Sequence, residues 1–178
     1  MQAVKKVIAE LIYIFCNYII AYIPLWILRK ILYRMFGMKI GRGSRINMRC
    51  VIMNPWGIRI GDNSMINEYC LLDGRGGLVI GDNVSVSFRT VIWSASHHMN
   101  TPDFAYYKSK TIIQDGVWIG TGGVVQAGTT MEAMSVLGAN SVAPRLCVKN
   151  GVYVGVPAEL RYMRKAETTL LRNSGLFR

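Results

Sequence analysis

The chain is poor in residues that bind metals or form disulfides. It has two histidines and four cysteines in 178 residues, and no pair of cysteines has the spacing Cys-x-x-Cys. No cluster of histidines lies near a cysteine either, so the sequence suggests neither a zinc site nor a redox pair. Isolated thiols of this kind fit a reducing compartment. We interpret the four cysteines as small apolar fillers: Cys16, Cys50, Cys70 and Cys147.

Acidic residues are also few. The sequence has 10 Asp and Glu against 21 Lys and Arg, which gives a formal net charge of +11. Such a charge attracts polyanions. However, we find no helix-turn-helix pattern, no paired zinc-ligand spacing and no strand motif that combines aromatic and basic residues. We therefore predict no nucleic acid partner.

The N-terminal segment contains a run of residues with almost no charged side chains, and this run is long enough to cross a bilayer. Residues 7–28 contain a single charged side chain, that of Glu10. Glu10, Tyr13, Asn17 and Ala21 recur at helical spacing and form a less apolar stripe, and a proline at position 24 interrupts the run.

The flanks of this run favour the membrane surface. Residues 25–36 continue as a basic amphipathic stretch, and basic residues stand at both ends, without a clear positive-inside asymmetry. We expect residues 1–37 to form membrane-associating helices, a hairpin that lies in one leaflet and binds the membrane surface through residues 1–36. A full span, and helices that only pack on the domain or on a neighbouring subunit, are the alternatives.

A six-residue repeat fills residues 38–157, which we predict to be the catalytic domain. Aliphatic residues recur at every sixth position, with two extra residues at 55–57 and in 73–77 and a longer interruption before residue 113. The period is typical of a hexapeptide parallel β-helix, in which three hexads make one turn of a triangular coil. The sequence thus predicts an all-β fold of about five coils. The repeating residues are Ile40, Ile46, Ile52, Ile60, Ile66, Leu72, Ile80, Val86, Ile92, Ile113, Ile119, Val125, Met131, Leu137 and Ala143.

Small residues occupy the position four places after each aliphatic residue, where the chain turns a corner of the coil. Three cysteines, Cys50, Cys70 and Cys147, fall in that slot and are therefore assigned to packing rather than to nucleophilic chemistry. After Pro157 helical spacing returns, and we expect residues 158–178 to form a C-terminal helix that caps the coil or contacts a neighbour.

Five short motifs carry a resemblance to a known family. Ile60-Gly61-Asp62-Asn63, Leu72-Asp73-Gly74, Ser96-His97, Val117-Trp118-Ile119-Gly120 and Gly155-Val156-Pro157-Ala158 occur in that order. Over about residues 37–165 the chain resembles the hexapeptide-repeat acyltransferases, in the branch of sugar and exopolysaccharide O-acetyltransferases. The resemblance implies a left-handed coil, acetyl-CoA as acyl donor, and a homotrimer with active sites between subunits.

The resemblance also implies the catalytic residues. His97 ends the third regular coil and matches the catalytic histidine, which removes a proton from the acceptor hydroxyl as a general base. His98 is the alternative base, although its side chain should point to the other side of an extended chain. Asp73 matches a carboxylate that orients the imidazole or binds the acceptor. Asn67 and Trp93 are predicted to line the sugar site.

The acyl donor is expected to run along the later coils. The matching positions are Thr121, Gly122 and Ala139, with Arg145 or Arg161 as contacts for phosphate. The family's frequent Thr-Lys pair is Pro144-Arg145 in this chain. Two histidines are too few for the three zinc ligands of the carbonic anhydrases that share the fold, so we predict no metal.

The loop from Met99 to Lys110 leaves the coil beside the predicted base, and Tyr106 within it is assigned to acceptor recognition. We thus expect an O-acetyltransferase that acts on a sugar hydroxyl of a surface polysaccharide or lipid-linked glycan, in the cytoplasm at the inner face of the cell membrane. An acyltransferase for a small soluble acceptor, such as an antibiotic or an amine, and a non-catalytic trimeric scaffold are the alternatives.

Overall fold

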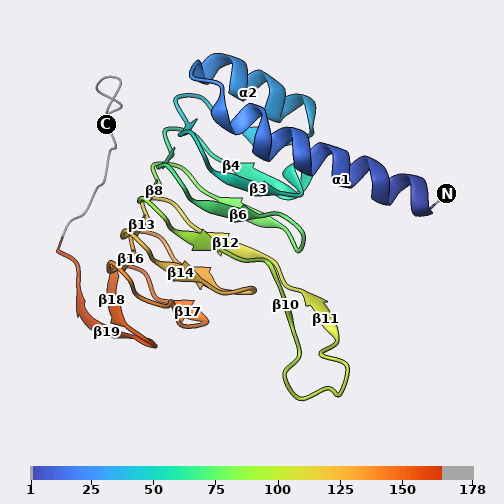
Figure 1. The fold of residues 1–178 in the computed structure, drawn as a ribbon. Coiled ribbons are helices and arrows are strands. Elements are labelled where there is room, and N and C mark those ends of the chain that lie inside the picture. Colours follow the sequence, from blue (N-terminus) through green and yellow to red (C-terminus); the bar gives the residue numbers. More distant parts are fainter. Residues whose placement is uncertain (1, 166–178) are drawn as a thin grey trace.

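The computed structural model describes residues 2–165, and the stacked coils of a parallel β-solenoid make up most of them (Figure 1). The first sheet has six strands, one from each coil, so the solenoid makes about six turns, close to the five predicted. The strands of this sheet are β1 (Lys39–Ile40), β4 (Ile58–Ile60), β7 (Leu78–Ile80), β12 (Thr111–Ile113), β15 (Thr130–Met131) and β17 (Leu146–Cys147).

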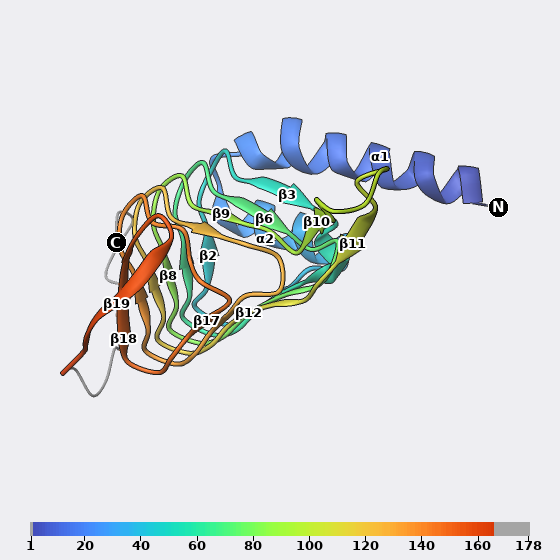
Figure 2. The ribbon, with the colours of Figure 1, turned by 90° about the horizontal axis from the view of Figure 1, so that it is seen from below.

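The second and third sheets complete the three-sided outline that Figure 2 shows. The second sheet consists of β2 (Arg45–Ile46), β5 (Met65–Ile66), β8 (Ser85–Val86), β13 (Trp118–Ile119), β16 (Val136–Leu137), β18 (Gly151–Gly155) and β19 (Ala158–Met163). The third sheet consists of β3 (Val51–Met53), β6 (Leu71–Asp73), β9 (Val91–Ile92) and β14 (Val124–Val125). We name the corners by the sheets they join: the 1–2, 2–3 and 3–1 corners.

The predicted six-residue ladder fills the interior. Ile40 pairs with Ile60 and Ile60 with Ile80, so identical positions of successive coils stack on one another. All the repeating aliphatic residues are buried. The ladder shifts near its end, where Cys147 pairs with Met131 and takes an inward strand position instead of the corner slot predicted for it. Cys147 is still a buried packing residue.

The irregular segments all lie at the 3–1 corner. The first insertion forms η2 (Pro55–Gly57), the second is the turn at 74–77, and the third is the antiparallel hairpin of β10 (Ala95–His97) and β11 (Tyr106–Lys108). This hairpin leaves the coil and projects from it (Figure 1). Glycine permits the tight stacking here, because a Cβ on Gly76 would lie 1.9 Å from the Ser94 carbonyl oxygen.

Two helices close the N-terminal end of the solenoid: α1 (Gln2–Tyr18) and α2 (Trp26–Met35), joined through η1 (Ile20–Tyr22). The side-chain amide of Asn17 donates to the Ile52 carbonyl at 2.9 Å and accepts from the Ile52 N–H at 2.7 Å. It thereby satisfies the open edge of the third sheet, as an added strand would. Arg29 of α2 is buried and donates to the Ile46 carbonyl of the second sheet at 3.0 Å.

Only the end of the less apolar stripe faces the solenoid. Asn17 of α1 and Ala21 of η1 are buried against it, whereas Glu10 and Tyr13 are exposed. Apolar side chains on α1 are exposed as well, among them Val4, Val7 and Leu11. No helix among residues 2–165 has the length and apolar character needed to cross a membrane.

The predicted C-terminal helix is wrong for its first part. Residues 158–163 form β19, which runs antiparallel to β18 and extends the second sheet. Apolar and polar residues alternate along most of this segment, and it lies beside the edge strand β18, whose backbone N–H and C=O groups it pairs with. The remainder of that prediction, from residue 166 to residue 178, lies outside the described residues.

Candidate active site

The base of the projecting hairpin positions His97. In the antiparallel register His97 stands opposite Tyr106, and the two rings are 5.5 Å apart. The Nδ1 atom of His97 lies 2.6 Å from the Phe104 carbonyl oxygen. A carbonyl can only accept, so Nδ1 carries the proton and the Nε2 lone pair is available as a base.

A cavity of about 240 Å³ lies beside this imidazole. It lies at the 3–1 corner, and aromatic rings and one guanidinium dominate its walls. His97 and Tyr106 contribute to it, whereas His98 does not, and the His98 ring instead contacts Tyr107 at 4.4 Å. The lining residues are Arg75, Trp93, Ala95, Ser96, His97, Tyr106 and Gln126.

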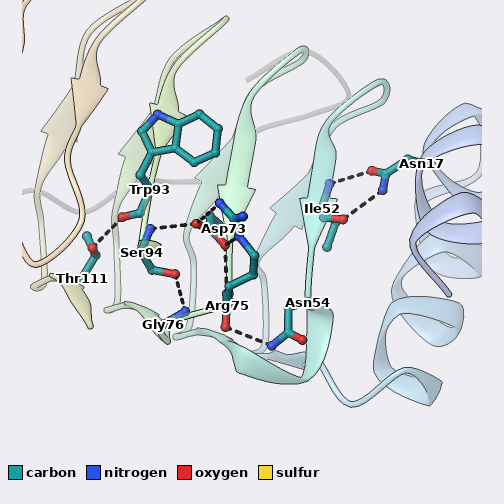
Figure 3. Close-up of polar contacts among 10 residues, drawn as sticks. Asn17, Ile52, Asn54, Asp73, Arg75, Gly76, Trp93, Ser94 and Thr111 are labelled. Carbon is teal, nitrogen blue, oxygen red and sulfur yellow. Dashed lines mark hydrogen bonds and ion pairs between the residues drawn. The ribbon is translucent and has the colours of Figure 1, made fainter. Parts of the chain in front are cut away.

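Asp73 is completely buried and does not hydrogen-bond to His97. Its Oδ1 accepts from the Nε of Arg75 at 2.9 Å and its Oδ2 accepts from Nη2 at 3.1 Å, which makes a bidentate ion pair. The Ser94 N–H also donates to Oδ2, at 3.0 Å. Figure 3 shows this network between the helical end and Trp93. Asp73 therefore acts on the cavity through Arg75.

Sequence reasoning missed Arg75, which is the cation of the cavity. Its guanidinium carbon lies 5.8 Å from the Trp93 ring and 5.8 Å from the Tyr106 ring. The hydrogen bonds that the guanidinium donates to the Asp73 carboxylate raise the pKa of Arg75 above its ordinary value. The available signal was a single arginine between glycines in the insertion one coil before His97.

The other predicted acceptor residues differ in their positions. Trp93 is half-buried in the cavity wall, and its carbonyl accepts from the Thr111 hydroxyl at 2.6 Å. Asn67 lies at the 2–3 corner, away from this cavity, where its amide donates to the Val86 carbonyl at 3.2 Å and accepts from Asn47. The side-chain amide of Asn67 thus stacks on that of Asn47 at the same corner of the neighbouring coil.

The predicted donor-binding residues occupy two corners. Thr121, Gly122 and Ala139 lie together at the 2–3 corner, where the Asn140 N–H donates to the Thr121 carbonyl at 2.8 Å. Arg145 lies at the 3–1 corner beyond the His97 cavity, and its Nη1 donates to the Ala127 carbonyl at 2.9 Å. Arg161 is exposed on β19, beyond the last coil. Their roles stay predictions.

The cysteines are buried and free. Cys50 donates to the Asn67 carbonyl at 3.1 Å and Cys70 to the Ser87 carbonyl at 3.0 Å, as Ser44 and Ser64 donate to carbonyls of the next coil at the 1–2 corner. Burial raises the pKa of Cys147 to about 12, so its thiol is protonated at neutral pH. Among residues 2–165, no three His, Cys, Asp or Glu side chains gather as a metal site would require.

A scan against protein-family models finds no match, and a search of the curated proteins finds none either. Solved structures do match. The hexapeptide-repeat-containing acetyltransferase VCA0836 from Vibrio cholerae is 27% identical, with a TM-score of 0.80 over 89% of this chain and 93% of that chain. Its structure complexed with acetyl-CoA is 28% identical, with a TM-score of 0.78 over 89% and 86% of the two chains.

More distant structures share the fold. A maltose O-acetyltransferase from Clostridium difficile 630 is 23% identical, with a TM-score of 0.77 over 89% of both chains. AntD, an N-acyltransferase from Bacillus cereus, is 21% identical, with a TM-score of 0.63 over 78% of this chain and 90% of that chain. The six-residue repeat, the β-solenoid and the likeness to VCA0836 agree with the resemblance to the hexapeptide-repeat acyltransferases.

Proposed function

We propose that the protein transfers an acetyl group from acetyl-CoA to a hydroxyl of a sugar. The observation that carries the proposal is His97, with Nδ1 bound to the Phe104 carbonyl and Nε2 available beside a cavity walled by Trp93, Tyr106 and Arg75. Aromatic rings stack on the apolar faces of sugars, and a guanidinium donates to hydroxyl oxygens. Both the aromatic side chains and the guanidinium in the cavity wall therefore suit a carbohydrate.

The chemistry follows from the tautomer of the imidazole that the contact with the Phe104 carbonyl selects. His97 Nε2 removes the hydroxyl proton while the acceptor oxygen bonds to the thioester carbonyl carbon. The tetrahedral oxyanion then collapses, the carbon–sulfur bond breaks, and the thiolate of CoA receives the proton from the imidazolium. General-base assistance of this kind contributes roughly 10² to 10⁴-fold to the rate.

Acetyl-CoA is the donor we assign, and the structure of VCA0836 complexed with it supports that choice. The expected contacts Thr121, Gly122 and Ala139 lie at a different corner of the coil from His97. A site that uses both corners therefore needs two protomers side by side. This arrangement supports a homotrimer, in which each 3–1 corner faces the 2–3 corner of a neighbour.

We place the protein at the inner face of the cell membrane, in the cytoplasm. Exposed apolar side chains of α1, such as Val4, Val7 and Leu11, support the association, because contiguous exposed apolar surface marks a protein or membrane contact. The acceptor would then be a surface polysaccharide or a lipid-linked glycan.

The test incubates the purified protein with acetyl-CoA and a panel of sugars, amino sugars and small amines, and identifies the products by mass spectrometry. Acetylation of a sugar hydroxyl is the expected result. Acetylation of amines alone would replace the proposal with N-acyl transfer, the reaction named for AntD. If acetyl-CoA neither binds in calorimetry nor is consumed, the protein is a scaffold and the proposal fails.

A further inference from the structure

A second cavity lies at the same corner, beneath the first helix. Its volume is about 450 Å³, nearly twice that of the His97 cavity. One wall comes from α1 and the other from the first 3–1 corner of the solenoid. The lining residues are Lys6, Ala9, Glu10, Tyr13, Ile14, Met53, Asn54, Pro55, Trp56 and Arg75.

The walls of this cavity, which we name the α1 groove, are mainly apolar. Trp56 is about half exposed into solvent although it is a large apolar side chain, and Tyr13 and Ile14 are exposed as well. The Asn54 amide is already engaged, because it donates to the Gly74 carbonyl at 3.0 Å. Charged groups are present at Lys6, Glu10 and Arg75. The chemistry of the walls suits hydrocarbon.

The α1 groove and the His97 cavity meet at Arg75, which lines both. Asp73 holds this side chain in place through two hydrogen bonds, so the guanidinium is a fixed boundary between an apolar compartment and an aromatic, polar one. Figure 3 shows the order along the coil, from Asn54 through Arg75 to Trp93. A single ligand that spans both compartments must join a hydrocarbon chain to a polar head.

We propose that the α1 groove binds the hydrocarbon chain of a glycolipid acceptor whose sugar lies in the His97 cavity. The inference rests on the proposed function and makes the acceptor an amphiphile rather than a free sugar. Helix α1 provides both one wall of the groove and the exposed apolar side chains proposed to contact the membrane. The hydrocarbon chain of a lipid that leaves the bilayer would therefore enter the groove next to that membrane contact. A second copy of the chain seated in the groove would not account for its junction with the His97 cavity.

The first test is a chain-length series of soluble acceptors. Alkyl glycosides of one sugar, with two, four, six and eight carbons, are used below their critical micelle concentrations. Each methylene buried is worth about 0.8 kcal/mol, so KM should fall by up to roughly fourfold per added carbon until the groove is full. A KM that is independent of chain length would overturn the inference while leaving sugar acetylation intact.

A groove-filling variant supplies the structural control. Ala9→Trp puts a large side chain into the groove and should abolish the dependence of KM on chain length. Ile8→Trp adds the same side chain at an exposed position outside the lining, and should preserve the wild-type series. Equal effects of the two variants, or a full series in Ala9→Trp, would contradict the assignment.

Binding without turnover separates this inference from the proposed function. Dodecyl maltoside, below its critical micelle concentration and without acetyl-CoA, should produce a saturable blue shift of tryptophan fluorescence that is lost in Trp56→Phe. A shift in a protein that acetylates no sugar would support the groove and refute the reaction. No shift in a protein that does acetylate sugars would refute the groove alone.

Discussion

The 2–3 and 3–1 corners of one solenoid differ in regularity and in chemistry. At the 2–3 corner every coil follows the six-residue step, and side chains such as Asn67 and Cys70 hydrogen-bond to the coil below. At the 3–1 corner three insertions interrupt the step, and they carry Trp56, Arg75 and His97. The repeat provides a rigid scaffold, and its interruptions supply the groups that can bind and react.

The largest change in activity should come from mixing two variants, one with a disabled 3–1 corner and the other with a disabled 2–3 corner. His97→Ala removes the base and Thr121→Trp blocks the predicted donor corner, so each variant alone should release CoA far more slowly than the wild-type protein. In randomly mixed trimers about one interface in four combines an intact 3–1 corner with an intact 2–3 corner, so about a quarter of the activity should return.

The readout is CoA release before and after the two variants are unfolded and refolded together, with each variant refolded alone as the control. If mixing restores nothing although the mixed protein is trimeric, the two corners do not form one shared site.

A smaller effect is expected from Asp73→Ala, which leaves Arg75 and the Ser94 N–H without their acceptor. The loss of a buried charged partner should lower the free energy of unfolding by about 3 kcal/mol. Turnover should fall at least tenfold, because the guanidinium is no longer fixed in the cavity wall. Thermal unfolding and CoA release measure the two effects.

Asp82→Ala is the matched control at the regular 1–2 corner. Asp82 is exposed and accepts from the Asp62 N–H at 2.6 Å, so its loss should cost about 1 kcal/mol or less and leave turnover unchanged. Equal losses of activity in the two aspartate variants would erase the distinction between the corners.

Trp93→Leu should raise KM for the sugar roughly tenfold, with a smaller change in kcat, because it removes a stacking wall and leaves the imidazole in place. Trp118→Leu is the comparison, since Trp118 is exposed on the regular strand β13 and donates to the Ser87 hydroxyl at 3.1 Å. Steady-state kinetics with varied sugar separate the two. A KM shift confined to Trp118→Leu would contradict the assignment of the cavity.

The smallest effect belongs to the thiols. Cys70→Ser preserves a donor for the Ser87 carbonyl at a buried corner. We expect a change of about 1 kcal/mol or less in the free energy of unfolding and no change in turnover. Thermal unfolding and CoA release measure both, and a loss of turnover would mean that the thiol has a chemical role.

The fold could be predicted from the sequence because an aliphatic residue at every sixth position marks the side chains that point into the solenoid. The ladder from Ile40 to Ile80 is an example. The strand β19 was missed because spacing in a short amphipathic segment does not show that a free edge lies next to it. The inward shift of Cys147 was missed because the hexad before it is short by two residues.

The site was predictable only in part. His97 could be found because it stands where the repeat stops. Its partner could not, since the Phe104 carbonyl is a backbone group whose position depends on the loop conformation. Asp73 was expected beside the imidazole, but the side chain that reaches its carboxylate is Arg75, two residues along the same turn.

The most direct measurement is CoA release from acetyl-CoA by His97→Ala and by His98→Ala, each compared with the wild-type protein at saturating sugar. The account predicts a fall of roughly 10² to 10⁴-fold for His97→Ala, with folding preserved because the side chain is exposed, and near wild-type turnover for His98→Ala. Undiminished turnover in His97→Ala would contradict it.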